Sequence, residues 1–210
     1  MTHLYLIRHG DSIDGLEDGK NSDLGLSAEG VRQAERLRDR LALSGEIKPD
    51  VFISSPERRA HETAGILAPA LSQPIILDNE VEEWRSDDGS LSSEEFMKRW
   101  EETPSSQRLF RHWVEGGESW VEFSARVQTA LDRILREHTG KTILLLTHGG
   151  DIQVAFFYFF GFGLANFRRS SMIVNKTSIT HWYQQEEEDR WILERFNDYH
   201  HLSDIGLTSK

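Results

Sequence analysis

Two segments far apart in the chain share one pattern of hydrophobic and polar positions. "LYLIRHG" begins at Leu4 with four apolar or aromatic residues and ends in Arg8, His9 and Gly10. "TILLLTHGG", residues 142 to 150, is a second apolar run that stops at a histidine followed by glycine. Continuous short apolar runs are typical of buried strands. Strands that end in such side chains indicate a functional site at their ends.

The rest of the chain alternates short apolar runs with segments of helical periodicity. Helical spacing places Val31, Ala34 and Leu37 on one face of a helix that follows Ser27. The alternation of strands and helices predicts an α/β fold with a mainly parallel sheet. The predicted strands are 3–8, 50–54, 74–77 and 142–147, the helices 27–45, 55–71, 92–103, 119–138 and 151–160, and the late hairpin 178–184 with 190–196.

Three of these helices carry a recognisable start. Ser92 and Ser119 are each followed three positions later by a glutamate, which is the pattern of a capping box. Ser55 precedes Pro56, so we expect Ser55 to cap a helix that has Pro56 in its first position.

Polar side chains that suit an anion follow three of the predicted strands. Arg8–His9, Ser54–Arg59 and His148–Gly149 each lie just beyond a strand's carboxyl end. Ligands of parallel α/β sheets bind at that edge. If the three strands are neighbours, these groups converge in one crevice.

This combination of residue types suits phosphoryl transfer. Arginine offers forked donors that match phosphate oxygens, and nearby glycines let backbone N–H groups approach an anion. A neutral imidazole, with an ordinary pKa of about 6.5, is a good nucleophile toward phosphorus. A carboxyl group could protonate the leaving oxygen and later activate water. The pattern therefore indicates a reaction through a phosphohistidine intermediate.

Several motifs, in order along the chain, resemble those of the histidine phosphatase superfamily, also called the phosphoglycerate-mutase-like fold. The resemblance covers most of the chain and implies a three-layer α/β/α sandwich with a mainly parallel sheet and a small helical insertion. The motifs are "LIRHG", "LGLSAEGVRQAERL", "SSPERRAHETA", "GGESWVEFSARV", "LLLTHGG" and "FNDYHHL".

The resemblance also implies a role for each matched residue. His9 is expected to be the phosphorylated nucleophile, and Glu83 in "VEEW" the general acid and base. Arg8 and Arg59 are expected to hold the phosphoryl oxygens. His148 is expected to be the second histidine, donating to the transferring group.

Some assignments stay open at this point. Gly149 through its backbone and Ser12 through its hydroxyl are further candidates for phosphate contact. Spacing alone does not separate Arg58 from Arg59, but the family pattern favours Arg59. Arg58 and Glu62 are four residues apart, which suits an ion pair on the helix surface. Spacing also leaves Glu80 and Glu82 open as alternatives to Glu83 for the general acid and base.

Within the family, the chain resembles the phosphatase branch. Glycolytic mutases typically follow the acid with an Arg-His-Tyr-Gly stretch, whereas Glu83 is followed by "WRSDDGS". The segment after His9 also lacks the asparagine of the mutase pattern. These departures favour hydrolysis of phosphomonoesters, with a phosphoglycerate-type mutase as the alternative.

Two further alternatives come from other functional classes. In a metal-dependent hydrolase, His9 with Asp11 and His148 with Asp151 would serve as ligands, but Arg8 beside the first histidine argues against a dication there. Chelation separates this alternative from a cofactor-free and metal-free phosphatase. A non-catalytic phosphate-binding member of the fold would bind anions without turnover.

Composition sets the remaining expectations. A chain of 210 residues fits one domain, 1–210, with a helical cap-like insertion at about 84–118 that is rich in aromatic residues. The net charge of −11 disfavours nucleic acid as a partner. No apolar run approaches the ~20 residues of a membrane span, and no export signal precedes the first strand, so we expect a cytoplasmic protein.

The expected partner is a small phosphorylated substrate or a phosphoprotein, and the sequence leaves a homodimer open. The absence of cysteine excludes disulfides and thiolate chemistry. The acidic segment "QQEEEDR" at 184–190 is expected to be a solvated hairpin tip.

Overall fold

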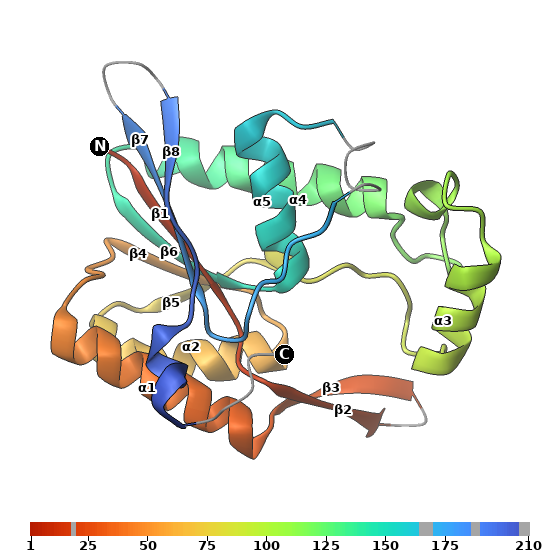
Figure 1. Ribbon diagram of the computed structural model, residues 1–210, viewed down its shortest axis with the longest axis horizontal. Coiled ribbons are helices and arrows are strands. Elements are labelled where there is room, and N and C mark those ends of the chain that lie inside the picture. Colours follow the sequence, from red (N-terminus) through yellow and green to blue (C-terminus); the bar gives the residue numbers. More distant parts are fainter. Residues whose placement is uncertain (18–19, 164–169, 186–189, 206–210) are drawn as a thin grey trace.

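The computed structural model describes residues 1–17, 20–163, 170–185 and 190–205, and its centre is a six-stranded sheet (Figure 1). The first four strands in spatial order pair in parallel, and the last two are antiparallel. The predicted mainly parallel sheet is thus confirmed. In spatial order the strands are β5 (Ile75–Leu77), β4 (Val51–Ser54), β6 (Thr142–Thr147), β1 (His3–Arg8), β7 (Ile179–Gln185) and β8 (Arg190–Asp198).

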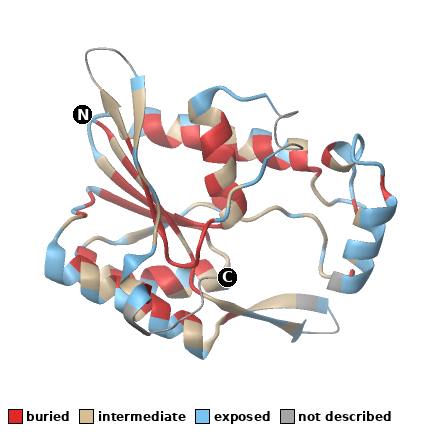
Figure 2. Ribbon diagram, in the orientation of Figure 1, coloured by how far each residue is buried: buried red, intermediate tan, exposed pale blue. Residues whose placement is uncertain are grey.

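Helices cover both faces of this sheet, which confirms the three-layer α/β/α sandwich (Figure 1). On one face lie α1 (Ala28–Ser44) and α2 (Arg58–Leu71), and on the other lie α4 (Trp120–Glu137) and α5 (Gly149–Phe160). Leu4 and Leu6 of β1 belong to the buried cluster of the α4–α5 face, whereas Ile7 belongs to that of α1 and α2. Because successive strand residues point to opposite faces, β1 anchors both cores. Figure 2 shows burial concentrated in the central strands.

The two capping boxes form as the sequence predicts. Ser92 begins α3 (Ser93–Glu102) and Ser119 begins α4, each with reciprocal bonds to the glutamate three residues later. The prediction for Ser55 is wrong, because α2 starts at Arg58. The backbone N–H of Ser55 still donates to Leu146 of β6, which continues the sheet and keeps this residue out of the helix.

A second hairpin was not predicted from the sequence. Residues just after the first histidine form β2 (Ser12–Glu17), which pairs antiparallel with β3 (Lys20–Leu26). Their glycine- and aspartate-rich sequence is typical of a loop. Contact with α2 stabilises the hairpin, because the backbone N–H of Leu26 donates to the carboxylate of Glu62 on that helix.

The late hairpin of β7 and β8 is confirmed, and its predicted acidic tip falls largely on 186–189, outside the described residues. The helix expected at 151–160 begins two residues earlier, at Gly149. The last described element is the 3₁₀ helix η4 (His200–Ile205). Among the described helices, none combines the length and apolarity that crossing a membrane requires.

Between β5 and α4 the chain leaves the sheet and forms a helical segment around α3 and the 3₁₀ helix η2 (Arg108–Phe110) (Figure 1). Aromatic rings hold it together. Trp84 lies edge-on to Trp120 at 5.2 Å between ring centroids, and Trp100 lies 5.5 Å from Trp113. Phe110 is 66% exposed and stays outside this cluster. Whether the segment acts as a cap over the site remains a prediction.

Candidate active site

The two motifs that end in histidine lie side by side. In the parallel pairing of β1 with β6, Arg8 is opposite Thr147, and β4 flanks β6 on its other side. His9 and His148 therefore leave adjacent strands at the same edge, with ring centroids 5.1 Å apart and planes inclined by 57°. His9 is 4% exposed and His148 is fully buried. The three strands β4, β6 and β1 are therefore neighbours, which is the condition for the groups at their ends to converge.

The hydrogen bonds of His9 define its tautomer. Its Nδ1 lies 2.6 Å from the carbonyl oxygen of Gly10. A carbonyl only accepts, so Nδ1 carries the proton and donates. The Nε2 of His9 then keeps its lone pair, and the Nε of Arg59 donates to it at 3.2 Å. The nitrogen that faces the arginine is thus the unprotonated, nucleophilic one.

The surroundings of His9 keep its imidazole neutral. Burial lowers the pKa of His9 well below its ordinary value, and the neighbouring His148, Lys176 and Arg59 lower it further. A neutral ring is the reactive form for attack on phosphorus. The Nε2 lone pair is therefore available throughout the physiological pH range.

His148 is held from both ring nitrogens. Its Nδ1 lies 3.3 Å from Nη2 of Arg59, and because a guanidinium only donates, this nitrogen accepts. Its Nε2 donates to the hydroxyl of Ser55 at 2.8 Å. Burial, followed by the charges of Arg59 and Arg8, lowers the pKa of His148 well below its ordinary value. The second histidine is also neutral before an anion arrives.

Arg59 lies between acidic side chains. Its Nη1 is 3.1 Å from Asp23 on β3, its backbone N–H donates to the same carboxylate at 2.9 Å, and its Nη2 pairs with Glu57. Arg58 points away and forms an exposed pair with Glu62 at 2.8 Å. The crevice therefore holds Arg59, and the surface ion pair expected for Arg58 is present.

Arg8 reaches the same crevice from β1. Its Nη1 donates to the carbonyl of Val174, and its buried Nε has no hydrogen-bond partner within the described part of the chain. A Cβ placed on Gly149 would lie 3.5 Å from that Nε, so the start of α5 packs against the guanidinium. A pocket of about 290 Å³ opens here and is lined by both of these residues and by Met172.

Glu83 lines the same pocket from the segment after the 3₁₀ helix η1 (Asn79–Val81). One carboxylate oxygen accepts from the backbone N–H of Gly150 at 3.3 Å and the other from that of Trp84 at 3.1 Å. A carboxylate at the start of α5 is also favoured by the helix dipole. Of its rivals, Glu80 is exposed and Glu82 pairs with Arg85 at 2.8 Å. Glu83 is the one that reaches the pocket beside Arg8.

Comparison with known families identifies the chain. The model of the histidine phosphatase superfamily, branch 1, matches residues 4–199. The chain belongs to this family. It is 30% identical over 222 residues to a probable phosphoglycerate mutase of Proteus mirabilis, covering 99% of this chain and 98% of that protein. It is 26% identical to a metal-independent phosphoserine phosphatase of Arabidopsis thaliana, covering 100% and 87%.

Solved structures agree with the fold of this histidine phosphatase. A phosphoserine phosphatase from Entamoeba histolytica, in complex with 3-phosphoglyceric acid, superposes with a TM-score of 0.74 at 20% identity and covers 96% of this chain and 100% of its own. The predicted family and fold are therefore confirmed. The matches support a hydrolase of the histidine phosphatase type.

The structure adds residues to the site beyond those that the sequence assigned to catalysis or phosphate binding. Asp23 and Glu57 contact Arg59, as described above. Lys176 is buried close to the two histidines, and burial together with Arg8 lowers its pKa to about 8. Asp151 is buried in the first turn of α5. Asp23 and Lys176 lie outside the family motifs, Glu57 lies within "SSPERRAHETA" without an assigned role, and Asp151 entered only as a ligand in the metal-dependent alternative.

Two expectations for the histidine phosphatase site concern Ser12 and a bound metal ion. Ser12 begins β2 opposite Leu26, and its contact with phosphate stays a prediction. Within the described ranges, no group of three or more His, Cys, Asp or Glu side chains is arranged to hold a metal ion.

The contact between Glu83 and α5 depends on a glycine. A Cβ on Gly150 would lie 2.1 Å from a carboxylate oxygen of Glu83, so Gly150→Ala must displace that carboxylate. We expect kcat/KM for an alkyl phosphate to fall by about 100-fold, the usual effect of misplacing a catalytic group by about 1 Å. The matched control is Gly65→Ala, because nothing lies within 4 Å of a Cβ on Gly65. Equal kcat/KM values for the two variants would show that this contact is not needed.

Proposed function

We propose that this histidine phosphatase is a phosphomonoesterase that works through a phosphohistidine at His9. The observation that carries the proposal is the hydrogen-bonded state of this ring, whose Nδ1 donates to Gly10 and whose Nε2 lone pair faces Arg59. In the first step, Nε2 forms a bond to phosphorus while the bond between phosphorus and the leaving oxygen breaks. Water then attacks phosphorus, the bond to Nε2 breaks, and inorganic phosphate is released.

Protons move through Glu83 in this scheme. A protonated Glu83 gives its proton to the leaving oxygen in the first step, and the resulting carboxylate takes one from the attacking water in the second. Its place in the pocket beside Arg8 and Gly149 supports this assignment. The two backbone N–H donors orient the carboxylate for both steps.

Arg8, Arg59 and His148 are proposed to bind the phosphoryl oxygens, together with the backbone at Gly149. Fixed donors aimed at the charge of the transferring group supply most of what phosphoryl transfer requires. In the unliganded site, Nδ1 of His148 accepts from Arg59. Donation from this nitrogen to phosphate therefore requires its protonation, which the negative charge of a bound phosphoryl group favours.

A second pocket suits the non-phosphate part of the substrate. It has a volume of about 460 Å³ and lies between the β2–β3 hairpin and the helical segment, with Asp23 shared between this pocket and the contact with Arg59. Its apolar wall includes Phe96 and Met97, and its polar wall includes Asp14 and Asp87. This size suits a small leaving group. We propose that α3 and its neighbours form a cap over it.

The charges of that pocket favour hydrolysis of a monoester over a mutase reaction. A phosphoglycerate-type mutase must hold a second anionic group of its substrate, and the carboxylates of Asp14, Asp23 and Asp87 would repel one. A neutral or cationic leaving group is compatible with them. Serine is a zwitterionic leaving group without net charge, so relatives named phosphoserine phosphatase support this choice.

A panel of phosphomonoesters, assayed with excess EDTA, tests the proposed function. We expect turnover to be unchanged by EDTA, because the groups that face the substrate are arginines and histidines. We also expect amino-bearing esters such as phosphoserine to exceed phosphoglycerate in kcat/KM. Loss of turnover in EDTA, with recovery on adding Mg²⁺ or Zn²⁺, would point to the metal-dependent alternative. Phosphate binding without turnover of any ester would point to the non-catalytic alternative.

A further inference from the structure

Glu57 lies inside the proposed phosphate site, although the mechanism above gives it no step. Its Oε1 accepts from the backbone N–H of Glu83 at 3.1 Å. Its Oε2 pairs with Nη2 of Arg59 and lies 3.6 Å from Nε2 of His148. The side chain is only 23% exposed. One carboxylate thus touches three of the residues on which the proposed reaction depends.

The guanidinium of Arg59 is therefore occupied before substrate arrives. Asp23 holds Nη1, and Glu57 holds Nη2 on the side where His148 also meets it. A phosphoryl group that binds between Arg59 and the histidines needs the same N–H donors. A carboxylate in that place competes for the donors and repels the incoming dianion, since like charges a few ångströms apart interact strongly in a partly buried site.

We propose that Glu57 makes phosphate binding pH-dependent, because its carboxylate competes with the phosphoryl group for Arg59 whereas its protonated form does not. The inference rests on the proposed function, in which Arg59 binds phosphate. In the protonated form, the O–H of Glu57 donates to a phosphoryl oxygen. In the ionised form, Glu57 must leave Arg59 before the anion binds.

The surroundings of Glu57 place the ionisation of its carboxyl group near neutral pH. Burial is the largest influence and raises the pKa of Glu57 to about 7. Arg59 acts in the opposite direction, whereas the charges of Glu83 and Asp23 add to the rise, and His148 faces Glu57 as a neutral ring. Glu57 is thus mostly protonated below pH 7 and mostly ionised above it. If only the protonated form admits phosphate, affinity falls about tenfold per pH unit above that point.

Inorganic phosphate is the probe, and Glu57→Gln is the variant. Glutamine keeps an oxygen that can accept from the backbone of Glu83, and its amide can donate to phosphate at every pH. We measure the dissociation constant of phosphate at pH 5.5 and pH 8.5 and compare the two proteins at each pH. This ratio cancels the ionisation of phosphate itself and of Lys176, which both proteins share. We expect a ratio near 1 at pH 5.5 and about 30-fold tighter binding by the variant at pH 8.5.

Controls separate the inference from the function on which it rests. Glu137→Gln removes a surface carboxylate that pairs with Arg133 at 3.6 Å, and it should follow the wild-type pH curve. If Glu57→Gln does not fold, Glu57→Ala removes the same charge and is measured instead. Parallel pH curves for the wild type and the Glu57 variant would overturn the inference. Failure of the wild type to bind phosphate at any pH would instead overturn the proposed phosphate site.

Discussion

His9→Ala is expected to abolish turnover of phosphomonoesters, with a loss of about 10⁴-fold or more, because it removes the atom that bonds to phosphorus. Neutral His148, whose Nε2 is bound to Ser55 and whose Nδ1 is bound to Arg59, is not free to replace it. Labelled substrate should leave an acid-labile phosphoprotein with the wild-type enzyme and none with the variant. The measurement is kcat/KM together with the amount of phosphoenzyme trapped in a rapid quench.

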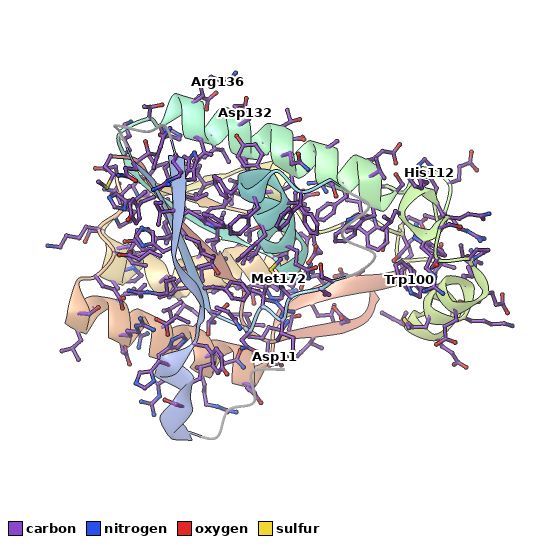
Figure 3. The ribbon with its side chains drawn as sticks, turned by 45° about the horizontal axis from the view of Figure 1, so that its top comes forward. Asp11, Trp100, His112, Asp132, Arg136 and Met172 are labelled. Atoms are coloured by element: carbon purple, nitrogen blue, oxygen red, sulfur yellow. The ribbon has the colours of Figure 1, made fainter. Side chains whose placement is uncertain are left out.

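The matched control for this variant is His112→Ala. His112 is half exposed and pairs with Glu122 at the start of α4. Figure 3 shows His112 on the helical segment, well apart from Asp11, which lies two residues after His9, so turnover and phosphoenzyme should be retained. His9→Ala should still bind inorganic phosphate, because both arginines remain in place. A phosphoprotein that forms in His9→Ala at the wild-type rate would assign the nucleophile to another residue. Thermal unfolding of both variants checks that the fold is kept.

The sequence predicted those parts of the site that follow strand ends. Arg8, His9 and His148 continue apolar runs, and a parallel sheet brings such positions to one edge whatever the details of packing. The helix starts at Ser92 and Ser119 were predicted equally well, because a capping box is satisfied within four residues.

The parts that the sequence did not predict depend on contacts between distant segments. Ser55 has the local signal of a helix cap, yet its backbone extends the sheet and its hydroxyl binds His148. The β2–β3 hairpin has a loop-like composition and gains support from α2. Glu57 and Lys176 are charged residues of unremarkable spacing, and only their burial beside other charges makes them part of the site.

The choice of Glu83 among three neighbouring glutamates also required the structure. Spacing in "NEVEEW" does not distinguish them. In the segment after η1, the carboxylate of Glu83 accepts from Gly150, whereas that of Glu82 pairs with Arg85. Family resemblance and geometry therefore select the same residue by independent arguments.

Glu83→Gln is expected to slow the enzyme according to the leaving group. An alkyl oxygen must be protonated as it departs, so kcat/KM for an alkyl phosphate should fall by about 10²- to 10⁴-fold. A nitrophenolate leaves without a proton, so kcat/KM for nitrophenyl phosphate should change little. We use kcat/KM because it reports the steps up to formation of the phosphoenzyme, even where hydrolysis of that intermediate limits kcat.

We expect a second, independent effect of Glu83→Gln, on hydrolysis of the phosphoenzyme. When formation of phosphohistidine from nitrophenyl phosphate is fast, loss of the base should slow only the attack of water, so the phosphoenzyme should accumulate. Glu82→Gln is the matched control, because it removes a neighbouring carboxylate that pairs with Arg85 outside the pocket. If Glu83→Gln slows both esters equally and no phosphoenzyme accumulates, Glu83 positions the site without transferring protons. If Glu82→Gln shows the leaving-group dependence instead, Glu82 is the general acid.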